Sequence, residues 1–236
     1  MTGILAIETA TEVCSVALYL DGDITERHEL APREHSRRLF SMLEELLPGG
    51  DLRRAGVDAI AYGCGPGSFT GLRICASAVQ GLAYTSELPA IAISTLACQA
   101  QTALREGSVV EDATVLSMLD ARINEVYYAV YRFDRGLPVL HSGPGAGAPG
   151  RIEPFDQTAM LQAVGSGARF IDQLPATVRA QLDTVSPDLL PAARDLLPLA
   201  LAGLARGQTQ SPREVQPVYV RDEISWKKLA EQGKPA

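Results

Sequence analysis

A glycine-rich run at residues 63–73 has the residue types that most readily support ligand chemistry. It reads Gly-Cys-Gly-Pro-Gly-Ser-Phe-Thr-Gly-Leu-Arg and lies between a short apolar run and an apolar helical pattern. Gly65 and Gly67 would let the backbone approach a ligand closely, and the amides at a helix start attract anions. Ser68 stands where the dinucleotide-binding motif has glycine, and no lysine follows as it does in a P-loop. Two interpretations stay open: a phosphate-contacting loop, and a tight turn capped by Ser68 or Thr70.

Nucleophilic and metal chemistry have little support in the residue types. No histidine lies near Ser68 in sequence, and its neighbours do not match the G-x-S-x-G motif of hydrolases. The three histidines share no metal-ligand spacing, and the four cysteines contain no C-x-x-C pair. We therefore predict no serine nucleophile, no metal site and four free thiols in a reducing compartment.

The charge pattern argues against two kinds of phosphate chemistry. The net charge is −7, which does not favour a chain that holds a nucleic-acid backbone by itself. The only lysines are Lys227, Lys228 and Lys234. P-loop enzymes and protein kinases need a lysine early in the fold, so we exclude both classes.

Residues 1–104 have the hydrophobic patterns of an α/β lobe. Apolar, β-branched runs separated by turn signals predict three strands, followed by helices that alternate with two further strands. The strands are expected at 3–9, 14–20, 24–30, 58–63 and 90–94, and two of the helices at 32–47 and 70–84.

Residues 105–236 form the second predicted lobe, with a C-terminal arm that packs back on the first. Strands at 114–120 and 125–133 should form a hairpin, and the glycine-rich stretch 143–150 an exposed connection. Further elements are expected as a helix near 156–163, a strand at 169–171, a helix at 188–206 and a strand or docking arm at 215–221. No apolar stretch is long enough for a membrane helix, and no basic region precedes the first apolar run, so we expect a cytoplasmic protein.

The two halves resemble each other at their first hairpins. Residues 8–19 align without gaps on residues 120–131, with Glu8 and Asp120 each ending the first strand. A duplicated βββαβαβα unit is the architecture of the actin-like ATPase (ribonuclease H-like) folds, where such acids face each other across a nucleotide cleft. The residues that could make vestigial nucleotide or phosphate contacts are Glu8, Thr9, Thr11, Gly65, Gly67, Ser68 and Asp120.

Two helices carry more apolar surface than one sheet requires. The apolar arc of helix 32–47 covers roughly 160°, whereas packing on a sheet needs about 100°. Helix 70–84 is apolar nearly all round, which fits either a shared interface or a core helix beneath the other lobe. The predicted association surface comprises His35, Leu39, Met42, Leu43, Leu46, Arg73, Ala76, Ser77, Ala78 and Gln80.

A family resemblance is carried by residues 4–11, residues 32–36, residues 65–73, Asp120-Ala121-Arg122, Glu125-Val126-Tyr127 and residues 217–221. Together these segments resemble the TsaB (YeaZ) family, and the resemblance extends over essentially the whole chain. One departure is Glu8, where aspartate is more usual in the family.

The resemblance implies a scaffold role in making N6-threonylcarbamoyladenosine at position 37 of tRNAs that read codons beginning with A. It implies a homodimer and, through the same helical face, a heterodimer with TsaD, the paralogue that binds the metal and transfers the group. TsaE, a small ATPase, would join them, and tRNA would be contacted only through the complex. No cofactor would be required, and ATP or ADP would bind weakly or at the partner interface.

The resemblance also places Thr95 and Gln99 where the catalytic paralogue has a histidine pair. Neither residue is a competent transition-metal ligand. Two alternatives are an active nucleotide-hydrolysing or phosphotransfer enzyme that uses Glu8 and Asp120 to hold magnesium, and a peptidase. The first lacks a recognisable catalytic base, and the second lacks a nucleophile–base pair.

Overall fold

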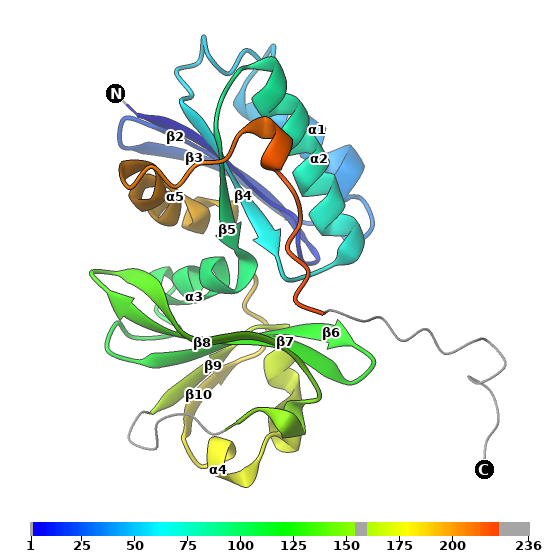
Figure 1. The fold of residues 1–236 in the computed structure, drawn as a ribbon, viewed down its shortest axis with the longest axis vertical. Coiled ribbons are helices and arrows are strands. Elements are labelled where there is room, and N and C mark those ends of the chain that lie inside the picture. The colour runs from blue at the N-terminus through cyan, green and yellow to red at the C-terminus, as the bar shows by residue number, and fades with distance from the viewer. Residues whose placement is uncertain (1, 154–159, 222–236) are drawn as a thin grey trace, which may run out of the picture.

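The computed structural model describes residues 2–153 and 160–221, which form two lobes stacked along the long axis (Figure 1). The first lobe is built on a five-stranded sheet of order β3-β2-β1-β4-β5. The β1–β2 and β2–β3 pairs are antiparallel, whereas β4 is parallel to both β1 and β5. The strands are β1 (Gly3–Glu8), β2 (Val13–Leu20), β3 (Asp23–Leu30), β4 (Ala59–Gly65) and β5 (Ala90–Ser94).

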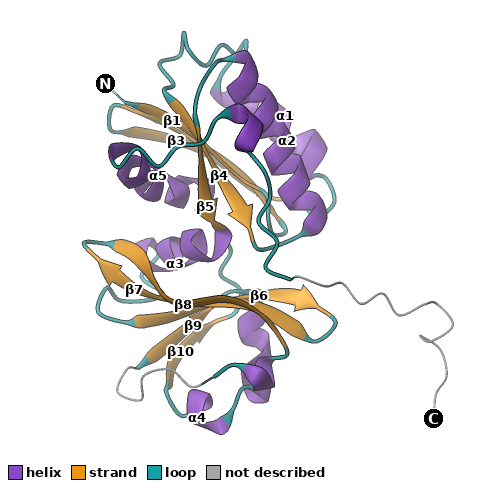
Figure 2. Cartoon of the chain, viewed as in Figure 1, coloured by secondary structure: helices purple, strands orange, loops and turns teal. Residues whose placement is uncertain are grey.

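The central strands of the first sheet are buried on both faces, as expected from their continuous apolar sequences. Successive side chains of β1 alternate between the faces, so Leu5 and Ile7 pack under helices α1 (His35–Leu46) and α2 (Phe69–Thr85). Ile4 and Ala6 point the other way and pack against helix α5 (Leu196–Ala205). Figure 2 shows the resulting three layers in the upper lobe.

The second lobe repeats the topology of the first, with a sheet of order β10-β9-β6-β7-β8. Its first strand again lies at the centre, between an antiparallel hairpin mate and a parallel neighbour. The fold is therefore the duplicated, actin-like, two-lobe α/β fold that the sequence predicts. The strands are β6 (Thr114–Arg122), β7 (Glu125–Asp134), β8 (Leu137–Gly147), β9 (Leu161–Val164) and β10 (Leu182–Ser186).

The remaining helices connect and cover the two sheets. Helix α3 (Thr95–Arg105) follows β5 directly, lies between the lobes and packs against β6 (Figure 1). The short helix α4 (Ala176–Arg179) and the 3-10 helix η2 (Ser166–Gln173) belong to the second lobe. Three shorter 3-10 segments are η1 (Pro149–Arg151), η3 (Ala193–Asp195) and η4 (Pro212–Glu214). The lobe boundary at residues 104 and 105 stays a prediction.

Four expectations for the second half were wrong in detail. The glycine-rich stretch 143–150 mostly belongs to β8, and residues 169–171 lie in η2 instead of a strand. The helix expected near 156–163 partly falls on residues 154–159, outside the described chain, and its end is the buried strand β9. The helix expected at 188–206 begins at Leu196, because Pro187 and Pro191 disfavour helix before it. No helix of the described residues is long and apolar enough to cross a membrane.

Candidate cleft and partner surface

The glycine-rich loop after β4 packs directly on the turn between β1 and β2. The Ser68 amide donates a hydrogen bond to the Ala10 carbonyl at 2.7 Å, and the Thr9 hydroxyl donates to the Gly71 carbonyl at 2.8 Å. Ser68 Oγ accepts from the Gly71 amide at 3.3 Å and so caps the start of α2. This geometry confirms the capped-turn interpretation of Ser68.

The glycines of this loop are explained by close backbone packing. A Cβ at Gly67 would lie 2.4 Å from the Ala10 carbonyl oxygen, and one at Gly71 would lie 2.0 Å from the Thr9 carbonyl oxygen. Gly65 has φ +122°, and a Cβ there would lie 2.6 Å from the Val218 carbonyl oxygen. Each glycine therefore allows another segment of this chain to approach, and none requires a ligand to account for it.

The two acids predicted to face a nucleotide cleft each bind their own hairpin turn. Glu8 Oε1 accepts from the Ala10 amide at 2.7 Å, and Asp120 Oδ1 accepts from the Arg122 amide at 2.7 Å. Both contacts join an acid to the amide two residues later, a turn-stabilising pattern. The shared pattern supports the alignment of the two halves at residues 8 and 120. It also gives each carboxylate an intramolecular partner.

Glu8 differs from Asp120 in its burial. The Glu8 side chain is fully buried, and its Oε2 has no hydrogen-bond partner among the described residues. Oε2 lies so close to β4 that a Cβ on Gly63 would be 1.9 Å away. Burial raises the pKa of Glu8 to about 7, and the Ala10 amide opposes this effect. The Asp120 side chain is 30% exposed and lies 3.8 Å from the Arg122 guanidinium.

Thr11 completes the predicted set of cleft contacts. Its hydroxyl accepts from the Val13 amide at 3.3 Å, which stabilises the same turn that Glu8 contacts. Six of the seven candidate residues therefore lie on the β1–β2 turn and on the loop after β4, which contact each other, whereas Asp120 lies at the β6–β7 turn of the second lobe. Their contacts in the structure hold these turns, and a nucleotide role for them stays a prediction.

Thr95 and Gln99 are both fully buried on α3. Gln99 Oε1 accepts from the Ser117 hydroxyl at 3.3 Å, and its Nε2 lies 3.4 Å from the Leu189 carbonyl oxygen. Thr95 Oγ1 makes no hydrogen bond of standard geometry within the described chain, but its side chain faces the Glu8 carboxylate and opposes the rise in the Glu8 pKa. The Gln99 side chain thus connects α3 to β6 and to the segment before η3.

Six of the ten residues of the predicted association surface are buried within the single chain, which corrects their assignment to that surface. His35 Nε2 lies 3.1 Å from the Val13 carbonyl oxygen, which fixes the start of α1 on β2. The wide apolar arc has an intramolecular cause, because α1 packs against β2, β3 and α2 together. The residues that are buried in the chain itself, and so not available to a partner, are His35, Leu39, Met42, Leu43, Ala76 and Ala78.

The outward face of α1 and α2 carries the exposed part of that surface. Arg73, Ser77 and Gln80 are exposed and Leu46 is half-buried. Phe40 and Tyr84 are 57% and 64% exposed and are absent from the predicted surface. Phe40 lies within the apolar arc of α1, which is the signal that could have identified it. The two helices lie side by side on the outside of the first lobe (Figure 2).

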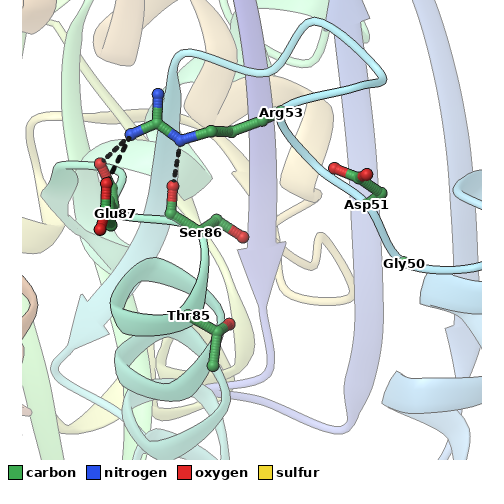
Figure 3. A pocket seen from close by; sticks show the side chains of 6 residues that line it. All are labelled: Gly50, Asp51, Arg53, Thr85, Ser86 and Glu87. Carbon is green, nitrogen blue, oxygen red and sulfur yellow. Dashed lines mark hydrogen bonds and ion pairs between the residues drawn. The ribbon is translucent and has the colours of Figure 1, made fainter.

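A shallow hollow of about 390 Å³ at the end of α2 has a structural explanation. Arg53 Nε donates to the Ser86 carbonyl at 2.5 Å, and its Nη2 donates to the Glu87 carbonyl at 2.7 Å (Figure 3). These bonds satisfy carbonyl groups at the C-terminal end of the helix. The hollow therefore surrounds a helix cap.

Comparison with known proteins places this architecture in one family. A family model described as "TsaD: tRNA N6-adenosine threonylcarbamoyltransferase" matches residues 26–141. The TsaB protein of Escherichia coli (strain K12), named tRNA threonylcarbamoyladenosine biosynthesis protein, is 40% identical over 233 residues and is aligned over 96% of this chain and 97% of its own. This chain belongs to the TsaB family. The corresponding Haemophilus influenzae protein is 36% identical over 239 residues, with 96% of each chain covered.

Solved structures agree with the TsaB assignment. A Pseudomonas aeruginosa protein, described as similar to peptidase YEAZ, superposes with a TM-score of 0.84 and is 38% identical. The alignment covers 94% of this chain and all of that one. A second structure, described as YeaZ from Pseudomonas aeruginosa, gives a TM-score of 0.83. The family predicted from the motifs is thus confirmed.

We expect this TsaB-family protein to purify without stoichiometric zinc or iron. Among residues 2–153 and 160–221, no three His, Cys, Asp or Glu side chains are placed to hold a metal ion. Thr95 and Gln99 offer a hydroxyl and an amide, which bind transition metals poorly. Elemental analysis of protein prepared without a histidine tag measures the metal content. About one metal per chain would contradict the prediction.

Proposed function

We propose that this chain is a non-catalytic subunit of the assembly that transfers threonylcarbamoyl to N6 of adenosine 37 in tRNAs that read codons beginning with A. The curated relatives are named for tRNA threonylcarbamoyladenosine biosynthesis, and they match this chain over nearly its whole length. In this proposal TsaD performs the transfer, and the present chain supports TsaD without contributing a residue to the chemical step.

The observation that carries the non-catalytic assignment is the internal use of the candidate cleft groups. The carboxylates of Glu8 and Asp120 each accept a turn amide, and the Ser68 hydroxyl caps α2. A phosphotransfer enzyme needs such carboxylates to hold magnesium and phosphates. Here the orientation of each carboxylate is set by a turn amide, while its other oxygen makes no such turn contact. We therefore propose that no cofactor is required and that ATP or ADP binds weakly or at a partner interface.

The outward face of α1 and α2 is the partner surface in this proposal. Exposed aromatic side chains, with polar residues around them, are typical of interface cores. Phe40 and Tyr84 provide the aromatic groups, and Arg73, Ser77 and Gln80 provide the polar ones. We propose that this face binds either a second copy of the chain or TsaD, and that TsaE joins the heterodimer. We place the assembly in the cytoplasm, with tRNA contacted only through the complex.

Reconstitution of the modification reaction tests the proposed function. We expect little modified nucleoside when this protein is omitted from a mixture of TsaD, TsaE, the donor-forming synthase and tRNA. Mass spectrometry of digested tRNA measures the product. Full modification without the protein would refute the proposal.

Point variants in the same assay test whether the chain contributes to the chemistry. Ser68→Ala and Asp120→Ala should retain most of the activity, because these side chains stabilise turns. Loss of the cap is expected to cost about 1 kcal/mol of stability, so each variant is assayed well below its unfolding temperature. A hundredfold loss of activity with TsaD binding intact would instead favour the phosphotransfer alternative.

A further inference from the structure

Residues 208–221, here called the strap, leave α5 and run along the first lobe toward the second (Figure 1). The strap begins beside β5. Gln210 and Ala90 exchange two backbone hydrogen bonds of 2.8 and 2.9 Å, in an isolated antiparallel bridge. Val215 is buried in the core under α1 and α2. The first part of the strap is therefore fixed to the first lobe.

The middle of the strap lies over the end of β4 and the start of α2. The Tyr62 hydroxyl accepts from the Gln216 amide at 3.3 Å, and the Val218 amide donates to the Cys64 carbonyl at 2.7 Å. Arg73 Nε donates to the Tyr219 hydroxyl at 3.1 Å, and the Arg73 guanidinium stacks 3.7 Å from the centre of the Phe69 ring. All these partners belong to the first lobe.

Arg221 makes the first contact of the strap with the second lobe. Its Nη2 donates to the Ala121 carbonyl at 3.3 Å and forms an ion pair with Glu125. The guanidinium also lies 6.0 Å from the centre of the Tyr127 ring. Ala121 is on β6 and Glu125 begins β7, so one side chain binds both strands beside their connecting turn. The Arg221 side chain is 20% exposed, which removes much of the solvent screening that weakens surface ion pairs.

The turn that Arg221 holds has an unusual backbone. Arg122, Ile123 and Asn124 all have positive φ values, of 66°, 55° and 56°. A β-branched residue such as Ile123 rarely adopts this conformation, and it persists only where the surroundings hold it. Glu125 and Ala121 lie at the two ends of these three residues. Arg221 therefore ties the strained turn at its base.

We propose that the strap is a clasp, in which Arg221 holds the second lobe against the first and can be released independently of the rest of the strap. The lobes are also joined by α3, whose buried residues pack against β6 and β7 on one side and against β4, β5 and α5 on the other, and by the segment between β10 and α5 (Figure 1). The strap reaches the β6–β7 turn from the first lobe as a separate tie. The contacts at Tyr62, Cys64 and Ala90 stay in place when the Arg221 contact breaks, so release of Arg221 frees the lobes to change their relative orientation.

The chemistry of the Arg221 contact suits a releasable tie. Its Nε is buried and makes no hydrogen bond to another described residue. The Glu125 side chain is 37% exposed, so water competes for the ion pair and limits its contribution to the closed state.

Pulsed electron–electron double resonance, which measures the distances between spin labels on the two lobes, tests the clasp. The labels are attached to Thr25→Cys in β3 and Arg179→Cys in α4, and the labelled protein is diluted with unlabelled protein to suppress signals between copies. The four native cysteines are at most 8% exposed and should not react in the folded protein. We expect one narrow distance distribution for the otherwise unchanged chain. Arg221→Ala should broaden it about twofold, as the lobes reorient.

Two further variants make the outcome decisive. Glu125→Gln keeps the shape of the side chain and should broaden the distribution in the same way. Arg213→Ala changes an exposed strap residue in η4 and should leave the distribution unchanged. Circular dichroism checks that each variant is folded, and Glu125→Gln decides the test if Arg221→Ala is not. Hydrogen exchange at residues 122–124 should be about tenfold faster in the opened variants. An unchanged distribution in folded Glu125→Gln and Arg221→Ala would overturn the proposal.

Discussion

Glu8 should make the protein about 3 kcal/mol less stable at pH 7 and above than at pH 4.5 and below. The folded-state pKa of Glu8 is raised to about 7 from 4.5 because the side chain is fully buried. Between these values the folded state keeps the proton and the unfolded state has released it. The unfolded state therefore binds fewer protons, and its free energy relative to the folded state falls as the pH rises. Below pH 4.5 both states are protonated, so the full contribution is present.

The measurement is urea unfolding of the natural chain and Glu8→Gln across this pH range. Glutamine has nearly the same shape and stays neutral, so the free energy of unfolding of Glu8→Gln should vary less with pH. Glu29 and Glu214, whose pKa values are lowered by Arg38 and by the Ser211 amide, are present in both proteins and cancel in the difference. Parallel pH curves for the two proteins would show that Glu8 keeps its ordinary pKa in the folded state.

If the outward face of α1 and α2 is the partner surface that we propose, Phe40→Arg should prevent self-association and weaken TsaD binding at least tenfold while the protein stays folded. Phe40 is 57% exposed on the outward face of α1, so an arginine there can remain in solvent in the single chain. In a complex the same charge would be buried without a partner, and residues at the centre of an interface typically contribute about 2 kcal/mol or more. Analytical ultracentrifugation and a titration with TsaD measure the two effects.

Two control substitutions separate a partner surface from the core. Met42→Arg, in the same helix, places a charge at a fully buried position and should unfold the protein. Val139→Arg changes a side chain on β8 that is 51% exposed and should leave association unchanged. If Phe40→Arg binds TsaD as tightly as the natural chain, the outward face of α1 is not the partner surface.

The first lobe was predictable because its strands are apolar runs separated by clear turns. The expected strand at 90–94 agrees with β5, and the other strands of this lobe differ at their ends by one or two residues. The second lobe has weaker signals. The strand β9 has only four residues, of which Gln162 alone is polar, so the sequence alone could not separate it from a short helix. The backbone of η2 depends on packing against β6, β7 and β9, which no local pattern encodes.

The sequence predicted which residues belong to the candidate cleft, but not what their side chains contact. The alignment of the two hairpins identified Glu8 and Asp120 as equivalent acids. What each carboxylate binds depends on one backbone amide, and the burial of Glu8 depends on the parallel pairing of β1 with β4. The association surface was overestimated for a related reason, since the helical pattern could not reveal that α1 also packs against α2 and β3.

Because Gly63 approaches Glu8 closely, the substitutions allowed at position 63 depend on the residue at position 8. Any side chain at position 63 would collide with the Glu8 carboxylate, since even a Cβ would lie 1.9 Å from Oε2. Replacement of Glu8 by a shorter acid such as aspartate removes the obstacle. Replacement of the glycine while Glu8 is present therefore requires the buried carboxylate to shift, whereas replacement after the glutamate has been shortened does not. Sterics thus favour one order, and related sequences with a side chain at position 63 should carry a shorter residue at position 8.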